Sequence, residues 1–211
     1  MFASLLAAAA VAATTAPSLP ADIDPKSLSR LAPLDRAALS PEGQRVYDVI
    51  RGANAAIPLN GPAPISMYSP GAAEPIDRLN QYLRKTVVGP RYFELSALTA
   101  AREFDQFYEW TGHEPAGRRA GLDAAVIDAV KFDRPVAGLP EKDATVISFG
   151  RALFREHRIS PALWAKTVEL FGQQGAVEIS AIMGDYALAA VLLIAADQHL
   201  PVDRPSLLPP K

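Results

Sequence analysis

Residues 94–122 concentrate side chains that can transfer protons, inside a segment otherwise rich in alanine and leucine. Glu109 and His113 are four positions apart, so on a helix their side chains share one face. A carboxylate beside an imidazole orients the ring and tunes its pKa, which suits general acid–base catalysis. Tyr108 adds a phenol that can donate a hydrogen bond to an oxyanion or enolate. We therefore predict a catalytic site in which His113 is the principal general acid–base.

Glu94 lies on the helix that the sequence predicts just before this one. If the two helices pack antiparallel, with the break near residues 105–106, Glu94 reaches the face that presents the carboxylate and the imidazole. We predict that Glu94 relays protons, and that Glu109 orients the imidazole or acts as a second base. Trp110 is expected to be buried and to form an apolar wall of the site. Gln106 is a second candidate substrate-binding residue.

Each of these residues also has an ordinary structural interpretation. A Glu–His pair at this spacing is often a solvated helix pair worth about 0.3 kcal/mol. His157 and His199 fall at predicted helix C-termini, where interaction with the helix dipole explains them. Three polar residues interrupt an otherwise apolar helix near the end of the chain, so they either have partners at an interface or face a cavity, and we expect interface or structural use ahead of catalysis. They are Glu178, Asp185 and Tyr186.

The composition excludes several other chemistries. The chain has no cysteine, which rules out disulfides, thiolate metal sites and thiol redox reactions. A net charge of −2 and the lack of a basic run argue against nucleic acid as a partner. No glycine-rich phosphate loop is present. Glu94, Glu109 and His113 could together bind a metal, but the two-histidine facial triad is absent, so we predict no metal ligand and no cofactor.

Hydrophobic periodicity predicts an all-α protein of about seven or eight helices, with no alternating strand pattern. Ser40 and Pro41 form a helix start signal. We expect Gly89 and Pro90 to stop one helix, and Gly175 to separate two others. The helices predicted after the first one span residues 74–87, 93–104, 108–120 (with Gly112 and Pro115 as points of kinking), 124–131, 141–157, 162–173 and 176–199.

The prolines and small residues divide the chain into four segments. We expect residues 1–16 to be a signal peptide or a disordered leader, because Phe2 to Ala13 form a short apolar run before small residues. This slightly favours a periplasmic or secreted protein over a cytoplasmic one, although no lysine or arginine precedes the run. An extended arm (17–33), a helical domain (34–200) and a proline-rich tail (201–211) follow. A proline-rich loop, 53–67, interrupts the domain.

A membrane span is not expected. Outside the N-terminal run, the longest apolar stretch, residues 186–196, is much shorter than the roughly 20 residues that a bilayer requires. Asp185 precedes this stretch and Asp197 follows it.

Two blocks resemble the carboxymuconolactone decarboxylase family, which shares its fold with the alkylhydroperoxidase AhpD proteins. The first is PRYFELSALTAAREFDQFYEWTGHEPAGRRAGLDAAVIDAV, with Glu94, Tyr108 to Trp110, His113 and Gly121-Leu122. The second is ALFREHRISPALWAKTVELFGQQGAVEISAIMGDYALAAVLLIA, and the resemblance covers roughly residues 34–200. It implies an AhpD-like all-α fold whose subunits pack through long helices into a homo-oligomer, typically a trimer or hexamer.

The resemblance also implies which reaction to expect. The peroxidase branch uses a Cys-x-x-Cys pair, and its two cysteine positions fall here on Gln106 and Glu109, so thiol peroxidase chemistry is excluded. Glu94 and His113 match the glutamate and histidine of that branch by spacing. The decarboxylase branch works without the cysteines, a metal or an organic cofactor, by moving protons to and from carbon.

Three functions remain open at this stage. The first is a cofactor-independent, decarboxylase-like lyase acting on a small carboxylated or lactone substrate. The alternative is a non-catalytic oligomer with the same fold that binds a small molecule or serves as a scaffold; it predicts that Glu94 and His113 pair in a closed, dry core. A weaker alternative is a detoxification enzyme with a metal bound by Glu94, Glu109 and His113.

Overall fold

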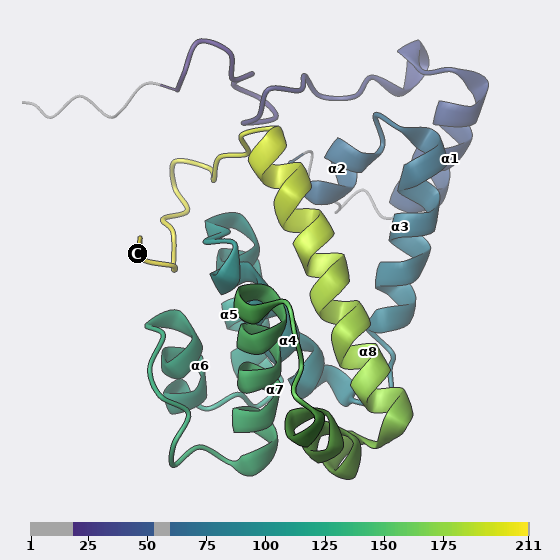
Figure 1. The fold of residues 1–211 in the computed structure, drawn as a ribbon. Coiled ribbons are helices and arrows are strands. Elements are labelled where there is room, and N and C mark those ends of the chain that lie inside the picture. The colour runs from purple at the N-terminus through teal and green to yellow at the C-terminus, as the bar shows by residue number, and fades with distance from the viewer. Residues whose placement is uncertain (1–18, 53–59, 211) are drawn as a thin grey trace, which may run out of the picture.

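The computed structural model describes residues 19–52 and 60–210, which form eight α-helices and no β-strand (Figure 1). This confirms the all-α prediction. The predicted leader and residues 53–59 of the predicted loop lie outside the described residues. The helices are α1 (Pro41–Arg51), α2 (Pro62–Ser66), α3 (Pro70–Leu83), α4 (Gly89–Glu103), α5 (Phe107–Arg119), α6 (Ala124–Lys131), α7 (Glu141–Arg151) and α8 (Pro161–Ala195).

Prolines and capping side chains set several helix starts. Ser40 and Ser160 cap α1 and α8 as N-cap residues, and each side-chain oxygen accepts a hydrogen bond from a backbone N–H three residues on. The prediction that Gly89 and Pro90 stop a helix is wrong, because both lie in the first turn of α4. A proline there removes no helical hydrogen bond. For the same reason α3 begins at Pro70, earlier than predicted.

Two other expected interruptions also differ. α5 continues through Pro115, and the long C-terminal helix breaks at Gly172, where φ is 73°, instead of at Gly175. Gly175 is helical, and a Cβ atom at this position would lie 2.8 Å from Cβ of Phe171 and 3.4 Å from Cγ1 of Val88. Its small size therefore serves close packing, while the left-handed φ of Gly172 makes the bend.

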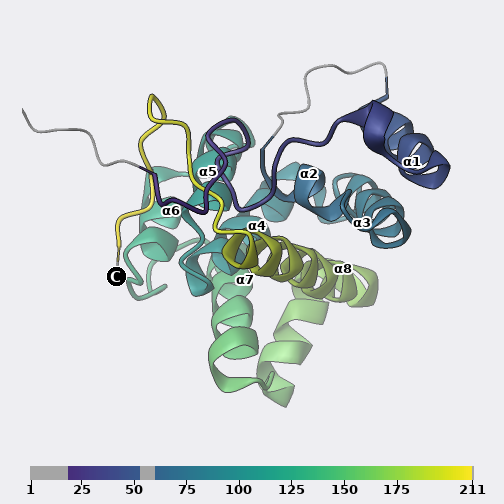
Figure 2. The same ribbon diagram turned by 90° about the horizontal axis from the view of Figure 1, so that it is seen from above.

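α4 is the central helix of the core. All residues from Phe93 to Arg102 are buried, because α5, α7 and α8 pack around this helix. Figures 1 and 2 show α8 running between the group formed by α1, α2 and α3 and the group formed by α4 to α7. The two groups therefore meet along α8. Because α4 is buried, the carboxylate of Glu94 lies inside the protein.

The arm and the tail are both held against the helices. Gln198 donates from Nε2 to the backbone oxygens of Ser27 and Leu28 in the arm, and its Oε1 accepts from the N–H of Gly61 at 3.0 Å. In the tail, the N–H of Leu207 donates to Oγ1 of Thr111 on α5 at 3.1 Å. Residues near both ends of the described chain are thus fixed close to the ends of α5 and α8.

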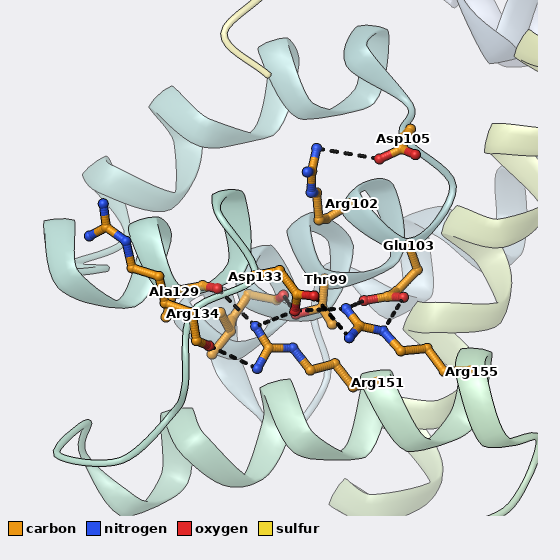
Figure 3. Close-up of polar contacts among 10 residues, drawn as sticks. Thr99, Arg102, Glu103, Asp105, Ala129, Asp133, Arg134, Arg151 and Arg155 are labelled. Atoms are coloured by element: carbon orange, nitrogen blue, oxygen red, sulfur yellow. Dashed lines mark hydrogen bonds and ion pairs between the residues drawn. The ribbon is translucent and has the colours of Figure 1, made fainter. Parts of the chain in front are cut away.

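A network of ion pairs ties α4 to the π-helical turn that follows α7, Ala152–Glu156 (Figure 3). Arg155 binds both oxygens of Glu103, at 2.7 and 2.6 Å. Asp133 lies between Arg155 and Arg151, at 2.9 and 3.1 Å from their nitrogens. None of these groups is a candidate site residue, so we interpret the network as structural.

Among the described residues, α8 is long and apolar enough, by length and composition, to cross a membrane. A core helix meets the same criteria, and α8 buries Ile179, Ile182 and Met183 in the core. Length and composition are therefore weak evidence for a span.

Candidate active site

The α4–α5 hairpin brings the predicted catalytic residues together. Three residues connect the helices, and Asp105, at φ 48°, turns the chain. Oε1 of Gln106 then accepts from the N–H of Tyr108 at 3.0 Å and caps α5. α5 folds back against α4, which confirms the prediction that Glu94 reaches the face of α5 that carries His113.

His113 lies between two carboxylates. Its Nδ1 is 2.7 Å from Oε2 of Glu94, and its Nε2 is 3.4 Å from Oε2 of Glu109. The side chains of the three residues are 13%, 10% and 7% exposed, in the order His113, Glu94, Glu109. Burial alone would lower the pKa of His113, but the hydrogen bonds and charges of Glu109 and Glu94 outweigh it and raise the pKa to about 9. The imidazole is therefore protonated at neutral pH.

Aromatic rings fix the plane of the imidazole. The ring of Tyr186, on α8, packs edge-to-face against His113 with centroids 4.7 Å apart. Phe93 lies 6.3 Å from His113 and packs edge-to-face on Tyr186 at 5.7 Å. Burial raises the pKa of Tyr186 well above its usual value, so its hydroxyl stays neutral and can donate a hydrogen bond.

A pocket of about 340 Å³ opens beside His113. Tyr108, Glu109 and His113 line it, whereas Glu94 lies behind the imidazole and does not. The pocket therefore exposes the Nε2 side of the ring, and the Nδ1 side faces the core. The remaining walls come from α2, α3, α8 and the tail, and they include Pro62, Ala63, Ile76, Asp77, Asn80, Arg84, Asp185, Tyr186, Leu188, Leu192 and Arg204.

Tyr108 stands at the side of the pocket next to the chain before α2. Its hydroxyl donates to Oδ1 of Asn60 at 2.9 Å, and burial raises the pKa of its phenol to about 12. Gly61, at φ 100°, lies against the same ring, and a Cβ there would be 2.9 Å from the hydroxyl. The phenol is thus neutral and fixed in position, and its one proton is directed at Asn60, so it can donate to an oxyanion only by exchanging that partner.

The structure places the two predicted substrate-binding residues away from the pocket. Trp110 is 0% exposed, and its Nε1 donates to Oε2 of Glu114 at 2.7 Å. Lys131 also binds Glu114, at 2.7 Å. The side chain of Gln106 is buried at the helix start that it caps. Both residues hold α5 in place and do not line the cavity.

Several pocket residues have no role in the sequence-based prediction. Asn80 and Arg84 come from α3, and Arg204 comes from the tail. Asp185 and Tyr186, which we expected at an interface or in a structural role, face the cavity from α8. Their signal was visible in the sequence as two polar residues within an apolar helix, but it did not reveal which surface they met.

No family model matches the sequence, and a search of curated proteins found no match. The resemblance to the carboxymuconolactone decarboxylase family stays a prediction. Within residues 19–52 and 60–210, no group of three or more histidine and carboxylate side chains is arranged to hold a metal ion.

Proposed function

We propose that the protein is a cofactor-independent acid–base enzyme of the carboxymuconolactone decarboxylase type, acting on a small carboxylated or lactone substrate. The observation that carries this proposal is the His113 imidazole held between Glu94 and Glu109 at the wall of a pocket of about 340 Å³. A buried group with a displaced pKa beside a cavity is typical of proton-transfer sites.

In the proposed reaction, the bond between a carbon and its carboxylate breaks and CO₂ leaves. The electron pair stays on the substrate as an enolate, whose oxygen would accept a hydrogen bond from Tyr108 once the phenol proton turns from Asn60 to the substrate. His113 then delivers its Nε2 proton to the carbon, and water restores the proton to the imidazole. Glu94 keeps the ring oriented through Nδ1, and Glu109 is the carboxylate that can receive a proton inside the pocket.

The presence of the cavity supports this proposal over the non-catalytic alternative. That alternative predicted a Glu94–His113 pair in a closed, dry core. The pair exists, but the pocket meets His113 and Tyr108. The weaker, metal-dependent alternative has no supporting observation among the described residues.

The test is turnover of a panel of γ-lactones and carboxylated lactones, followed by CO₂ release and by NMR of the products. We expect His113→Gln to abolish turnover and Glu94→Gln to reduce it. His157→Asn is the matched control, because His157 is exposed, lies outside the pocket and has a φ of 53° that asparagine tolerates. Equal rates for wild type and the two site variants would show that these residues do not carry the reaction.

We also propose that the chain forms a homo-oligomer through α8. Three aliphatic side chains, Val177, Val191 and Ile194, are 52–59% exposed on this helix, and Leu188 beside them is 38% exposed. A second copy would cover this face. Light scattering should report a trimer or hexamer, and Val191→Glu should dissociate it. Val202→Glu, at a tail residue that is 90% exposed, should not dissociate it. A wild-type monomer would contradict this proposal.

A further inference from the structure

Arg84 is one of two arginines of the pocket that the proposed reaction does not use; the other, Arg204, donates to the backbone oxygen of Thr111. Arg84 ends α3, and its side chain lies at the wall of the cavity. Nε donates to Oδ1 of Asn80 at 2.9 Å, and Nη2 donates to the hydroxyl of Tyr186 at 3.3 Å. The guanidinium also stacks over the ring of Phe93 at 5.0 Å. All of these partners are uncharged.

Arg84 therefore differs from other arginines of the protein. Arg91 pairs with Asp143 at 2.7 Å, and Arg155 pairs with Glu103 at 2.6 Å. In the part of the chain that the structure describes, no carboxylate lies within ion-pairing distance of Arg84. A guanidinium positioned by neutral groups at a cavity wall is left with its charge available to a ligand.

Asn80 explains why a nearby carboxylate does not neutralise Arg84. Its Oδ1 accepts from Arg84, and its Nδ2 donates to Oδ2 of Asp185 at 2.7 Å. The amide thus lies between the guanidinium and the carboxylate and makes one hydrogen bond to each. An aspartate at this position would form an ion pair with Arg84, whereas the uncharged asparagine leaves the positive charge of Arg84 without a counter-charge.

Tyr186 connects Arg84 to the catalytic histidine. Its hydroxyl accepts from Arg84, and its ring packs edge-to-face on His113 at 4.7 Å. Because the hydroxyl accepts from Arg84, its own proton is available for a ligand. A ligand oxygen at the guanidinium could take both donors, while the ligand's carbon skeleton extends along the tyrosine toward Nε2 of His113.

We propose that Arg84 and Tyr186 form a carboxylate-binding subsite that anchors the substrate opposite His113. The guanidinium would bind a carboxylate of the ligand, and the hydroxyl of Tyr186 would donate to the same group. The substrate class is then a small monocarboxylate or carboxylated lactone. That the bound molecule is a substrate rests on the proposed function, but the binding of a carboxylate does not.

The charged side chains that line the pocket are equal in number, three acidic and three basic. Asp77, Asp185 and Glu109 are its carboxylates, and Arg84, Arg204 and the His113 imidazolium are its cations. The side chain of Asp77 accepts from Gln81 at 2.6 Å. The lining groups balance three against three, and Glu94 behind the imidazole adds one further negative charge, so the guanidinium itself must attract the carboxylate of the ligand.

The experiment measures binding by calorimetry at pH 7, without turnover. The probes are 4-oxopentanoate, a small keto acid, its methyl ester, and n-butylamine, a cation of similar size. We expect the acid to bind wild type more tightly than the ester or the amine. Arg84→Gln should weaken binding of the acid by about tenfold and leave the ester unchanged. Arg84→Lys, which keeps the charge without the fork, should retain part of the preference.

Lys85→Gln is the matched control, because Lys85 is exposed, is adjacent in the chain and does not line the pocket. It should bind the acid as wild type does. Equal affinity for acid and ester, preference for the amine, or unchanged binding in Arg84→Gln would overturn the subsite, as would an acid that fails to bind at millimolar concentration. If the subsite behaves as expected while wild type turns over no lactone, the proposed function fails and the subsite stands.

Discussion

The variant Glu94→Gln keeps the shape of the predicted proton relay and removes its negative charge, so it tests whether the charge matters. Glutamine can still hydrogen-bond to Nδ1 of His113, but the substitution removes the nearer of the two carboxylates, 2.7 Å away against 3.4 Å for Glu109. The pKa of His113 rises from 6.5 to about 9 against the opposing effect of burial. Both carboxylates contribute to that rise, Glu109 somewhat more than Glu94, so the variant should lower the pKa of His113 by about one unit, or about 1.4 kcal/mol.

The assay is an NMR titration of the imidazole C–H signals. The chain has three histidines, and His113→Gln and His157→Asn assign their signals. Wild type should show one imidazole that titrates near 9, and in Glu94→Gln the same signal should titrate at about 8. Glu156→Gln, which neutralises an exposed glutamate of the π-helical turn, is the control and should leave the titration unchanged.

The result that would refute this reasoning is a His113 signal that still titrates near 9 in Glu94→Gln. It would mean that Glu109 alone holds the charge and that the Nδ1 contact is not electrostatically important. A wild-type imidazole that titrates near 6.5 would also refute it, since the buried carboxylates would then not stabilise the imidazolium.

Three further outcomes follow from the same geometry. Because the folded state raises the pKa of His113, the associated stabilisation, about 3 kcal/mol, is complete below pH 6.5 and lost as the pH rises through 9; urea unfolding at several pH values should show this loss in wild type and not in His113→Gln. Gly61→Ala should lower the free energy of unfolding by about 1–3 kcal/mol, and by more than Gly138→Ala does. Both glycines have a positive φ, but only Gly61 touches a tyrosine ring. Trp110→Phe should cost about 2 kcal/mol in urea unfolding, because Glu114 loses a buried donor, yet should leave binding of 4-oxopentanoate unchanged.

The sequence sufficed for the half of the site built on the α4–α5 hairpin. Glu109 and His113 share a helix face by their spacing, and the break near residue 105 allows a short connection that brings Glu94 to them. These are local relations, so helical geometry determines them. The burial of Trp110 was also predictable. The direction in which its ring points was not, because a buried ring can face either the core or a cavity.

The other half of the site depends on contacts between distant segments. Asn80 and Asp185 are 105 positions apart and meet only because α3 packs on α8. No periodicity within either helix reveals that pairing. The glycines show the same limit: Gly172 and Gly175 both interrupt an apolar pattern, and only the packed structure shows that the first bends the chain while the second admits Phe171.

The number of donors on the imidazole determines which step His113 can perform. A neutral imidazole has one N–H, so it could serve only one of two buried carboxylates, whereas the imidazolium serves both. The resting form is therefore the acid. When a proton leaves, we expect the ring to keep the N–H that points to the nearer partner, which is Glu94 at 2.7 Å on the core side. The proton on Nε2, 3.4 Å from Glu109 and facing the pocket, is the one that can be transferred. In the reaction that we propose, Glu94 would thus fix the tautomer that remains. Glu109 would meet the ring where substrate enters, so that proton delivery to a carbanion would come before proton abstraction.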